Sequence, residues 1–115
     1  MPIRDLRTGQ VAWAVLEGAH GREQTGRRPV VVIASNTYLE IVTTLAMIVP
    51  VTTTERGWPN HVRLTGATGL SRPSWAMTEQ IVTISRTRLV DRAGSVDEPC
   101  IDLIRLHLRD FLGFR

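Results

Sequence analysis

A run of β-branched residues at positions 30–33, Val-Val-Val-Ile, is the feature that most limits how this chain can fold. Residues of this kind favour strands. Because no polar residue alternates with them, the segment from Pro29 to Ala34 is typical of a strand buried on both faces. The chain has 115 residues, enough for one core, so we expect residues 1–115 to form a single domain.

Several other short segments have the pattern of strands. Residues 9–16 place Val11, Trp13 and Val15 on one side, and residues 45–51 form a second apolar run. Further strands are expected at 61–64, 74–84 and 89–92. Segments rich in Gly, Pro and polar residues separate them as loops or turns, at 17–28, 35–38, 55–59 and 66–70.

The C-terminal segment has the pattern of a helix. Its apolar residues recur at helical spacing: Ile101, Ile104, Leu108, Phe111 and Leu112. Residues 95–98, Ser-Val-Asp-Glu, have the form of a capping box, Pro99 lies in the first turn, and Gly113 ends the helix. Five or six short strands followed by one C-terminal helix predict a mainly β fold, a small curled antiparallel barrel with the helix on its flank.

The basic residues are unevenly placed. All fourteen cations are Arg, and with eleven acidic residues they give a net charge of +3. Residues 1–28 carry five Arg against three acids, and residues 55–92 carry six against three. Every cation is therefore a planar fork able to hold a phosphate through two bonds. Two separate basic segments point to an anionic partner, although a charge of +3 is weak evidence by itself.

Several classes of protein are excluded or disfavoured. No apolar run approaches the roughly 18 residues of a membrane span, and the N-terminus lacks the apolar region of a secretory signal. We therefore expect a cytoplasmic protein without membrane association. Cys100 is the only cysteine, so an intramolecular disulfide and a multi-cysteine metal site are excluded; we expect Cys100 to be a small core residue.

Common catalytic motifs are absent: the sequence has no P-loop, no H-E-x-x-H and no G-x-S-x-G. Of the histidines, His107 lies beside the apolar stripe of the helix, where a structural role is expected. His20 and His61 are far apart in sequence and would form a two-histidine nuclease site only if the fold joined them.

Two strand ends carry the polar groups of a candidate site. Arg27 and Arg28 precede Pro29, which restricts Arg28 to an extended backbone, and Thr52, Thr53 and Thr54 follow the strand at 45–51. Taken separately, the arginines fit a solvated loop, and the threonines fit ordinary β propensity. If the two ends meet at one rim of the barrel, guanidinium and hydroxyl donors form a pocket suited to a phosphate that develops charge.

At these residues the sequence resembles the MazF/PemK (Kid) family of toxins. The resemblance covers roughly residues 8–90 and rests on the combination of motifs rather than on any one of them. The first is Gly21 to Ile33, which includes Glu23, Gln24, Arg28 and Pro29. The others are Val-Pro-Val-Thr-Thr at 49–53, Gly-Trp-Pro at 57–59, Gly-Leu at 69–70 and Glu-Gln-Ile-Val-Thr-Ile at 79–84.

The resemblance implies a sequence-specific endoribonuclease of a toxin–antitoxin pair, with an SH3-like barrel of the CcdB/PemK type that acts as a homodimer. It implies cleavage of single-stranded RNA by the RNA's own 2′-hydroxyl, leaving a 2′,3′-cyclic phosphate and a 5′-hydroxyl. No metal or other cofactor is expected, and a MazE-like antitoxin is the expected protein partner.

The same resemblance assigns roles to residues. Arg28 and Thr52 fall on the family's catalytic Arg and Thr. RNA contacts are expected from six further residues: Glu23, Gln24, Arg27, Thr53, Glu79 and Gln80. Trp58 and Trp75 are candidates for base stacking, although a place in the core or in a dimer interface is the more usual role.

The chain departs from the family pattern at two places. Gln10 stands where the first strand usually has Asp, and Val82 stands where Arg or Lys usually follows the Glu-Gln-Ile motif. Val82 removes an expected phosphate contact, for which Arg72 and Arg86 are candidate replacements. Two alternatives keep the fold without the reaction: a CcdB-like DNA gyrase poison and a non-catalytic SH3-like binding module.

Overall fold

The computed structural model describes residue 3, residues 5–16 and residues 26–114. In chain order the strands and helices are β1 (Gln10–Val15), β2 (Arg27–Val32), α1 (Asn36–Ile41), β3 (Leu45–Thr52), β4 (His61–Arg63), β5 (Trp75–Met77), β6 (Val82–Ser85), β7 (Leu89–Ser95) and α2 (Glu98–Leu112). A 3-10 turn at Arg86–Arg88 joins β6 to β7. The prediction of a mainly β chain with one long C-terminal helix is confirmed.

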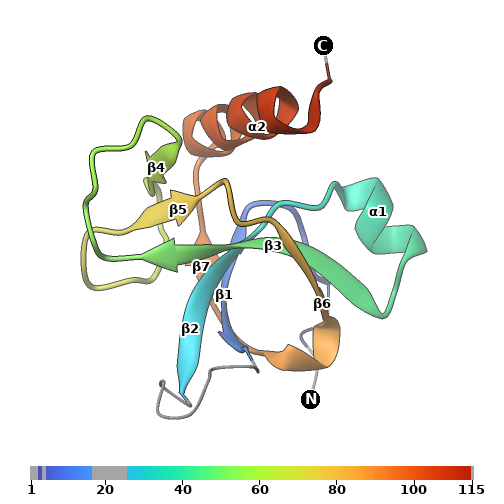
Figure 1. The fold of residues 1–115 in the computed structure, drawn as a ribbon. Coiled ribbons are helices and arrows are strands. Elements are labelled where there is room, and N and C mark those ends of the chain that lie inside the picture. The colour runs from blue at the N-terminus through green and yellow to red at the C-terminus, as the bar shows by residue number, and fades with distance from the viewer. Residues whose placement is uncertain (1–2, 4, 17–25, 115) are drawn as a thin grey trace.

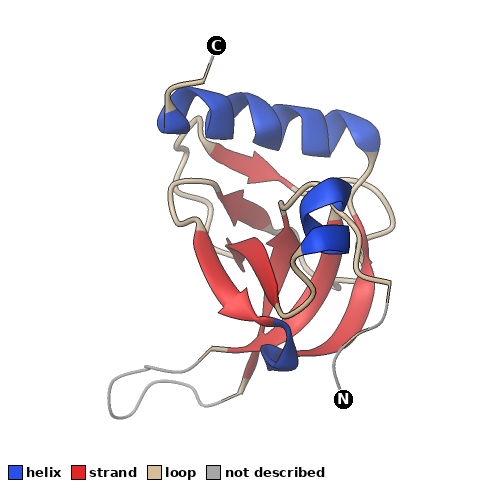
Figure 2. Cartoon of the chain, turned by 90° about the vertical axis from the view of Figure 1, so that its right-hand side faces the viewer, coloured by secondary structure: helices blue, strands red, loops and turns tan. Residues whose placement is uncertain are grey.

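β3 is the centre of the antiparallel sheet. In the described part of the chain the strand order is β4-β5-β3-β2-β1-β7, and β6 also pairs with β3. β2 pairs with one edge of β3, while β6 and β5 pair with the two ends of its other edge. Figure 1 shows the strands curling around a common interior, with α2 lying across the β4 and β5 end of the sheet. Figure 2 shows the same arrangement from the side.

The core has two parts, one on each face of β2. Val30 and Val32 lie inside the curled sheet with Ala12, Ile48 and Leu89. Val31 lies on the opposite face, in the cluster that α2 covers with three side chains: Ile101, Ile104 and Leu108. All three valines of β2 are fully buried, so the predicted strand with two buried faces is confirmed.

The segment at 74–84, predicted as one strand, is two. Between β5 and β6 the chain turns: the Gln80 N–H donates to the Met77 carbonyl over 3.0 Å, and the buried Thr78 hydroxyl donates to the Asn60 carbonyl over 2.7 Å. The sequence predicted a strand here but not this turn, because Thr-Glu-Gln at 78–80 carries no Gly, Pro or Asn to mark it. As a consequence, Glu79 and Gln80 lie on a turn rather than inside a strand.

Three further differences are local. Residues 36–41 form α1, although only a turn at 35–38 was expected, because the Ser35 hydroxyl accepts the Tyr38 N–H over 3.0 Å as an N-cap. α2 is capped by Asp97 rather than by a Ser95 capping box, since Ser95 is the last residue of β7. Phe111 and Leu112 were predicted on the buried stripe but are 52% and 57% exposed, because the buried part of α2 ends at Leu108.

No helix in the described ranges is long and apolar enough to cross a membrane.

Candidate active site

An open pocket of about 500 Å³ lies where the ends of β2 and β3 come together. Five of the residues predicted for the site line it: Arg27, Arg28, Thr52, Thr53 and Gln80. Pro29, Pro50, Val51, Thr54, Arg56 and Met77 complete the lining. The two strand ends therefore meet, as the candidate site required. A larger groove of about 610 Å³ on the outer side of α2 contains none of the predicted site residues.

The pairing of β2 with β3 explains why Arg28 and Thr52 share this pocket. The strands run antiparallel, with Val30 opposite Pro50 and Val32 opposite Ile48. Carried two residues further, this register sets Arg28 opposite Thr52. Side chains alternate between the faces of a strand, so both residues belong to the face that holds Val30 and Ile48 inside the curled sheet. They lie where this interior opens to solvent.

The two arginines before Pro29 differ in what surrounds them. Arg27 pairs with Asp91 over 3.4 Å, and its guanidinium carbon lies 5.6 Å from the centre of the Trp13 ring. Within residues 26–114, by contrast, no acidic side chain pairs with Arg28, which is exposed at the pocket. Among the described side chains, Arg28 is thus free to meet an anion with its full charge.

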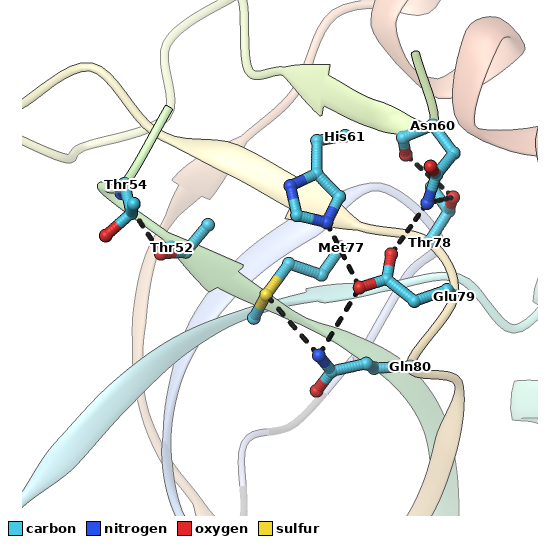
Figure 3. A network of polar contacts seen from close by, with 8 residues as sticks. All are labelled: Thr52, Thr54, Asn60, His61, Met77, Thr78, Glu79 and Gln80. Carbon is cyan, nitrogen blue, oxygen red and sulfur yellow. Dashed lines mark hydrogen bonds and ion pairs between the residues drawn. The ribbon is translucent and has the colours of Figure 1, made fainter. Parts of the chain in front are cut away.

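Thr52 is placed to act as a hydrogen-bond donor. Its Oγ1 accepts the backbone N–H of Thr54 over 3.1 Å, as Figure 3 shows. A hydroxyl has one hydrogen to donate in addition to its acceptor lone pairs. With a lone pair occupied by Thr54, the hydroxyl hydrogen remains to donate to a ligand in the pocket.

A polar network stands beside the pocket and centres on Glu79. Its Oε1 accepts the side-chain amide of Asn60 over 2.7 Å, and its Oε2 lies 3.1 Å from His61 Nε2 and 3.4 Å from Gln80 Nε2 (Figure 3). Partial burial acts to raise the pKa of Glu79. The hydrogen bond with His61, a bond from its own backbone, the electrostatic attraction of His61 and the hydrogen bond with Gln80 outweigh this effect and hold the pKa below its ordinary value of 4.5. Glu79 is therefore ionised at neutral pH.

Comparison with known proteins agrees with this geometry. The family model for PemK-like, MazF-like toxins of type II toxin–antitoxin systems matches residues 7–112. The chain belongs to this family. The endoribonuclease toxin MazF of Escherichia coli is 30% identical over 106 residues, which cover 91% of this chain and 92% of that protein. Endoribonuclease MazF6 of Mycobacterium tuberculosis is 34% identical over 94 residues, covering 79% and 82%.

Solved MazF structures share the fold. A crystal structure of MazF from Deinococcus radiodurans superimposes with a TM-score of 0.76 at 26% identity, covering 95% of this chain and 97% of that one. MazF in a MazE–MazF crystal structure from the same organism gives a TM-score of 0.79 at 24% identity, covering 96% and 98%. The predicted barrel of the PemK type is confirmed.

Other residues singled out in this MazF-family chain either fall outside the described residues or lie away from the pocket. Glu23, Gln24 and His20 fall outside the described residues. His107 is half-buried on α2, with its ring 6.4 Å from that of Phe111 and away from the pocket. Cys100 is buried in the core as expected, and burial raises the pKa of its thiol, so it stays neutral.

Arg72 and Arg86, the candidates to supply the phosphate contact that Val82 removes, differ in what surrounds them. Arg86 donates to main-chain carbonyls at the end of α1 and at the start of β3: from Nη2 to Val42 over 2.9 Å and from Nε to Leu45 over 3.0 Å. It therefore supports the fold rather than the pocket. Arg72 lines a smaller cavity of about 240 Å³, which shares Pro29 and Thr53 with the main pocket.

Sequence reasoning missed Arg56 and Asn60 and considered His61 only as half of a two-histidine site, not as a partner of Glu79. Arg56 lines the pocket, with its guanidinium carbon 5.9 Å from the centre of the exposed Trp58 ring. Its position two residues after the threonine run could have revealed it. Asn60 and His61 hold Glu79, but they are 19 and 18 residues away in the chain, and no local pattern joins them. Among the described residues, no three His, Cys, Asp or Glu side chains are grouped as metal ligands would be.

Proposed function

We propose that this protein is an endoribonuclease toxin that cleaves single-stranded RNA in the pocket between β2 and β3, with Arg28 and Thr52 as its catalytic residues. The observation that carries the proposal is the convergence of two groups on one open pocket of about 500 Å³, in a chain of the MazF family. They are a guanidinium that pairs with no acidic side chain of the described residues and a hydroxyl whose hydrogen, among those residues, is left to donate. The relatives named endoribonucleases support the same activity.

The proposed reaction is a transfer of the phosphodiester within the RNA. The 2′-oxygen forms a bond to phosphorus, and the bond from phosphorus to the 5′-oxygen of the next nucleotide breaks. The 2′-hydroxyl loses its proton and the leaving 5′-oxygen gains one, so the products are a 2′,3′-cyclic phosphate and a 5′-hydroxyl. No water, metal or other cofactor enters this balance, and the proposal includes none.

The chemistry of their side chains indicates the roles of Arg28 and Thr52 in this reaction. During attack, negative charge grows on the non-bridging phosphate oxygens. A guanidinium fork and a hydroxyl donor at the pocket stabilise this charge more than that of the unreacted diester, which lowers the barrier. Arg28 stays protonated at neutral pH, so it acts as a cation and donor and not as the base that removes the 2′ proton.

The remaining predicted RNA contacts surround this centre. Gln80, Thr53 and Arg27 line the same pocket, within reach of nucleotides next to the cleaved bond. Glu79 stands behind Gln80, and Glu23 and Gln24 belong to the proposal through the family resemblance alone. Arg56, which sequence reasoning missed, adds a further cation for the phosphates.

The biological setting follows from the family. We propose a MazE-like antitoxin as partner, in line with the MazE–MazF complexes of Deinococcus radiodurans. We further propose that residues 1–115 form one toxin domain that acts as a homodimer in the cytoplasm, where messenger RNA is translated. Support for a dimer comes from exposed apolar side chains of α2: Leu103 and Leu106 on its outer side, and Phe111 and Leu112 in its last turn.

The test is cleavage of a long single-stranded RNA by the purified protein in excess EDTA, with the cut ends mapped. We expect cuts at a short recurrent sequence, with cyclic phosphate on one side and 5′-hydroxyl on the other. Ends that carry a 5′-phosphate would contradict the proposed chemistry. RNA left intact both with and without added Mg²⁺ would contradict the nuclease and favour a gyrase poison or a binding module with this fold.

A further inference from the structure

The side-chain amide of Gln80 lies between two groups that both attract hydrogen-bond donors. Its Nε2 is 3.4 Å from the Glu79 carboxylate and 3.7 Å from the Met77 sulfur (Figure 3). Gln80 also lines the pocket of Arg28 and Thr52. Gln80 is thus a polar side chain at the rim of the site, and its contacts with Glu79 and Met77 hold its amide nitrogen in place.

The charge on Glu79 decides which end of this amide faces the carboxylate. If the amide were turned by 180°, its carbonyl oxygen would stand next to a carboxylate oxygen, and two acceptors would face each other without a hydrogen between them. The NH₂ group is therefore turned toward Glu79. Figure 3 shows the Gln80 oxygen on the other side, pointing away from Glu79.

Glu79 is itself firmly held. Asn60 and His61 occupy both of its oxygens, and the His61 side chain is only 2% exposed. Asn60 is fixed in turn by the buried Thr78, whose hydroxyl donates to the Asn60 carbonyl over 2.7 Å. Together with Gln80, Asn60 and His61 make three side chains that engage the carboxylate, which suits a residue that positions another better than one that reads a base.

We propose that Gln80 is a specificity-determining residue that offers only its carbonyl oxygen to the RNA, and that Glu79 is the positioning residue that keeps it in this orientation. An acceptor at this point pairs with an amino group on a base edge and faces a carbonyl unfavourably. We place the Gln80 oxygen against the exocyclic group at C6 of a purine or C4 of a pyrimidine, where adenine and cytosine carry an amino group and guanine and uracil carry a carbonyl. At one position of its target the enzyme therefore prefers adenine over guanine, or cytosine over uracil.

This inference rests on the proposed nuclease activity and specifies its substrate. The test compares cleavage of a randomised RNA pool by the wild-type protein, Glu79→Gln and Gln80→Leu, with the base preference read by sequencing the cut ends. For the wild-type protein we expect one position of the target RNA at which bases that carry the amino group are preferred over bases that carry the carbonyl. In Glu79→Gln the amide can turn either way, so this ratio should fall roughly 5- to 10-fold, the effect of one neutral hydrogen bond. Gln80→Leu should lose the selectivity at the same position.

Two controls separate the possible results. Glu40→Gln removes an equal charge from exposed α1 and should leave the preference profile as in wild type. A target with purine riboside, which lacks the amino group, in place of adenosine tests the wild-type protein without any mutation and should react roughly 5- to 10-fold more slowly. For a cytosine-selective position, 2-pyrimidinone riboside serves in the same way.

The outcomes distinguish this inference from the one on which it rests. A wild-type protein that cleaves RNA but shows no amino selectivity at any position overturns the role of Gln80. Cleavage with a Glu79→Gln profile identical to wild type overturns the role of Glu79. A wild-type protein that leaves every RNA intact overturns the proposed function itself.

Discussion

At the scale of single residues, the Thr52 hydroxyl is the clearest case of a group prepared by its surroundings. Its oxygen accepts the Thr54 N–H, which leaves its hydrogen to donate. Thr52→Val keeps the shape and removes the donor, so we expect single-turnover cleavage to fall roughly 100-fold, the usual loss when one donor to a developing oxyanion is deleted. Thr52→Ser should retain most of the rate. Thr83→Val, on exposed β6, is the matched control, and a Thr52→Val rate equal to its rate would show that the hydroxyl plays no part.

Glu79 gives a prediction about pH. Its pKa is lowered in the folded protein, so its charge stabilises the fold fully above its ordinary value of 4.5, and this contribution is lost as the pH falls through the lower folded value. Denaturant unfolding of wild type and Glu79→Gln should therefore give free energies that differ most near pH 6 to 7 and converge as the pH falls below 4.5. Curves that stay parallel down to pH 3 would contradict the assigned shift.

Residue identities at the pocket were largely predictable, whereas their partners were not. Arg28 and Thr52 stand at the ends of two readable strands, and their motifs resemble one family. The hydrogen bonds from Asn60 and His61 to Glu79 depend on how the β4 segment is placed against the turn after β5. That placement is a tertiary property, and no local spacing in the sequence reveals it.

At the scale of elements, Asp97 marks where α2 begins. Its carboxylate accepts the Cys100 N–H over 3.1 Å and the Thr65 hydroxyl over 2.7 Å, so it caps the helix and ties it to the loop after β4. Asp97→Ala should lower the free energy of unfolding by about 1 to 2 kcal/mol. Asp102→Ala, on the exposed side of α2, is the matched control and should change it by less than about 0.5 kcal/mol. Equal losses in the two variants would contradict the cap.

Strands and helices were predictable where burial leaves a clear pattern of apolar residues in the sequence. β2 was readable because burial on both faces forces a continuous apolar run, and α2 because one of its faces is buried. The break between β5 and β6 was hidden because the residues at the turn, Thr-Glu-Gln at 78–80, include none of the Gly, Pro, Asn, Asp or Ser residues that usually mark a turn. α1 has six residues and one buried side chain, Leu39, so it leaves little periodic signal.

One motif glycine has a structural explanation at this scale. Gly69 has φ +76°, and a side-chain carbon added to it would lie 2.0 Å from the Ala93 carbonyl oxygen. The loop after β4 therefore passes directly against β7, and only glycine fits both the backbone conformation and the space.

At the scale of the whole molecule, the proposed homodimer gives a direct prediction. Leu106 is 48% exposed on the outer side of α2, among other exposed apolar side chains. Light scattering at micromolar concentration should give twice the chain mass of 12.8 kDa, and Leu106→Arg should shift the protein toward monomer. Ile41→Arg is the matched control, because Ile41 is 74% exposed on α1. A wild-type protein that is strictly monomeric would contradict the dimer, and a dimeric Leu106→Arg would move the interface away from α2.

The central claim is that Arg28 stabilises the charge that grows on the cleaved phosphate, and single-turnover cleavage by Arg28→Ala tests it most directly. Arg105→Ala is the matched control, because Arg105 is an exposed arginine of α2 outside the pocket. We predict a fall of roughly 100- to 1,000-fold for Arg28→Ala, with an unchanged Tm and a smaller fall for Arg28→Lys, which keeps the charge but not the fork. A folded Arg28→Ala that cleaves as fast as Arg105→Ala would contradict the claim.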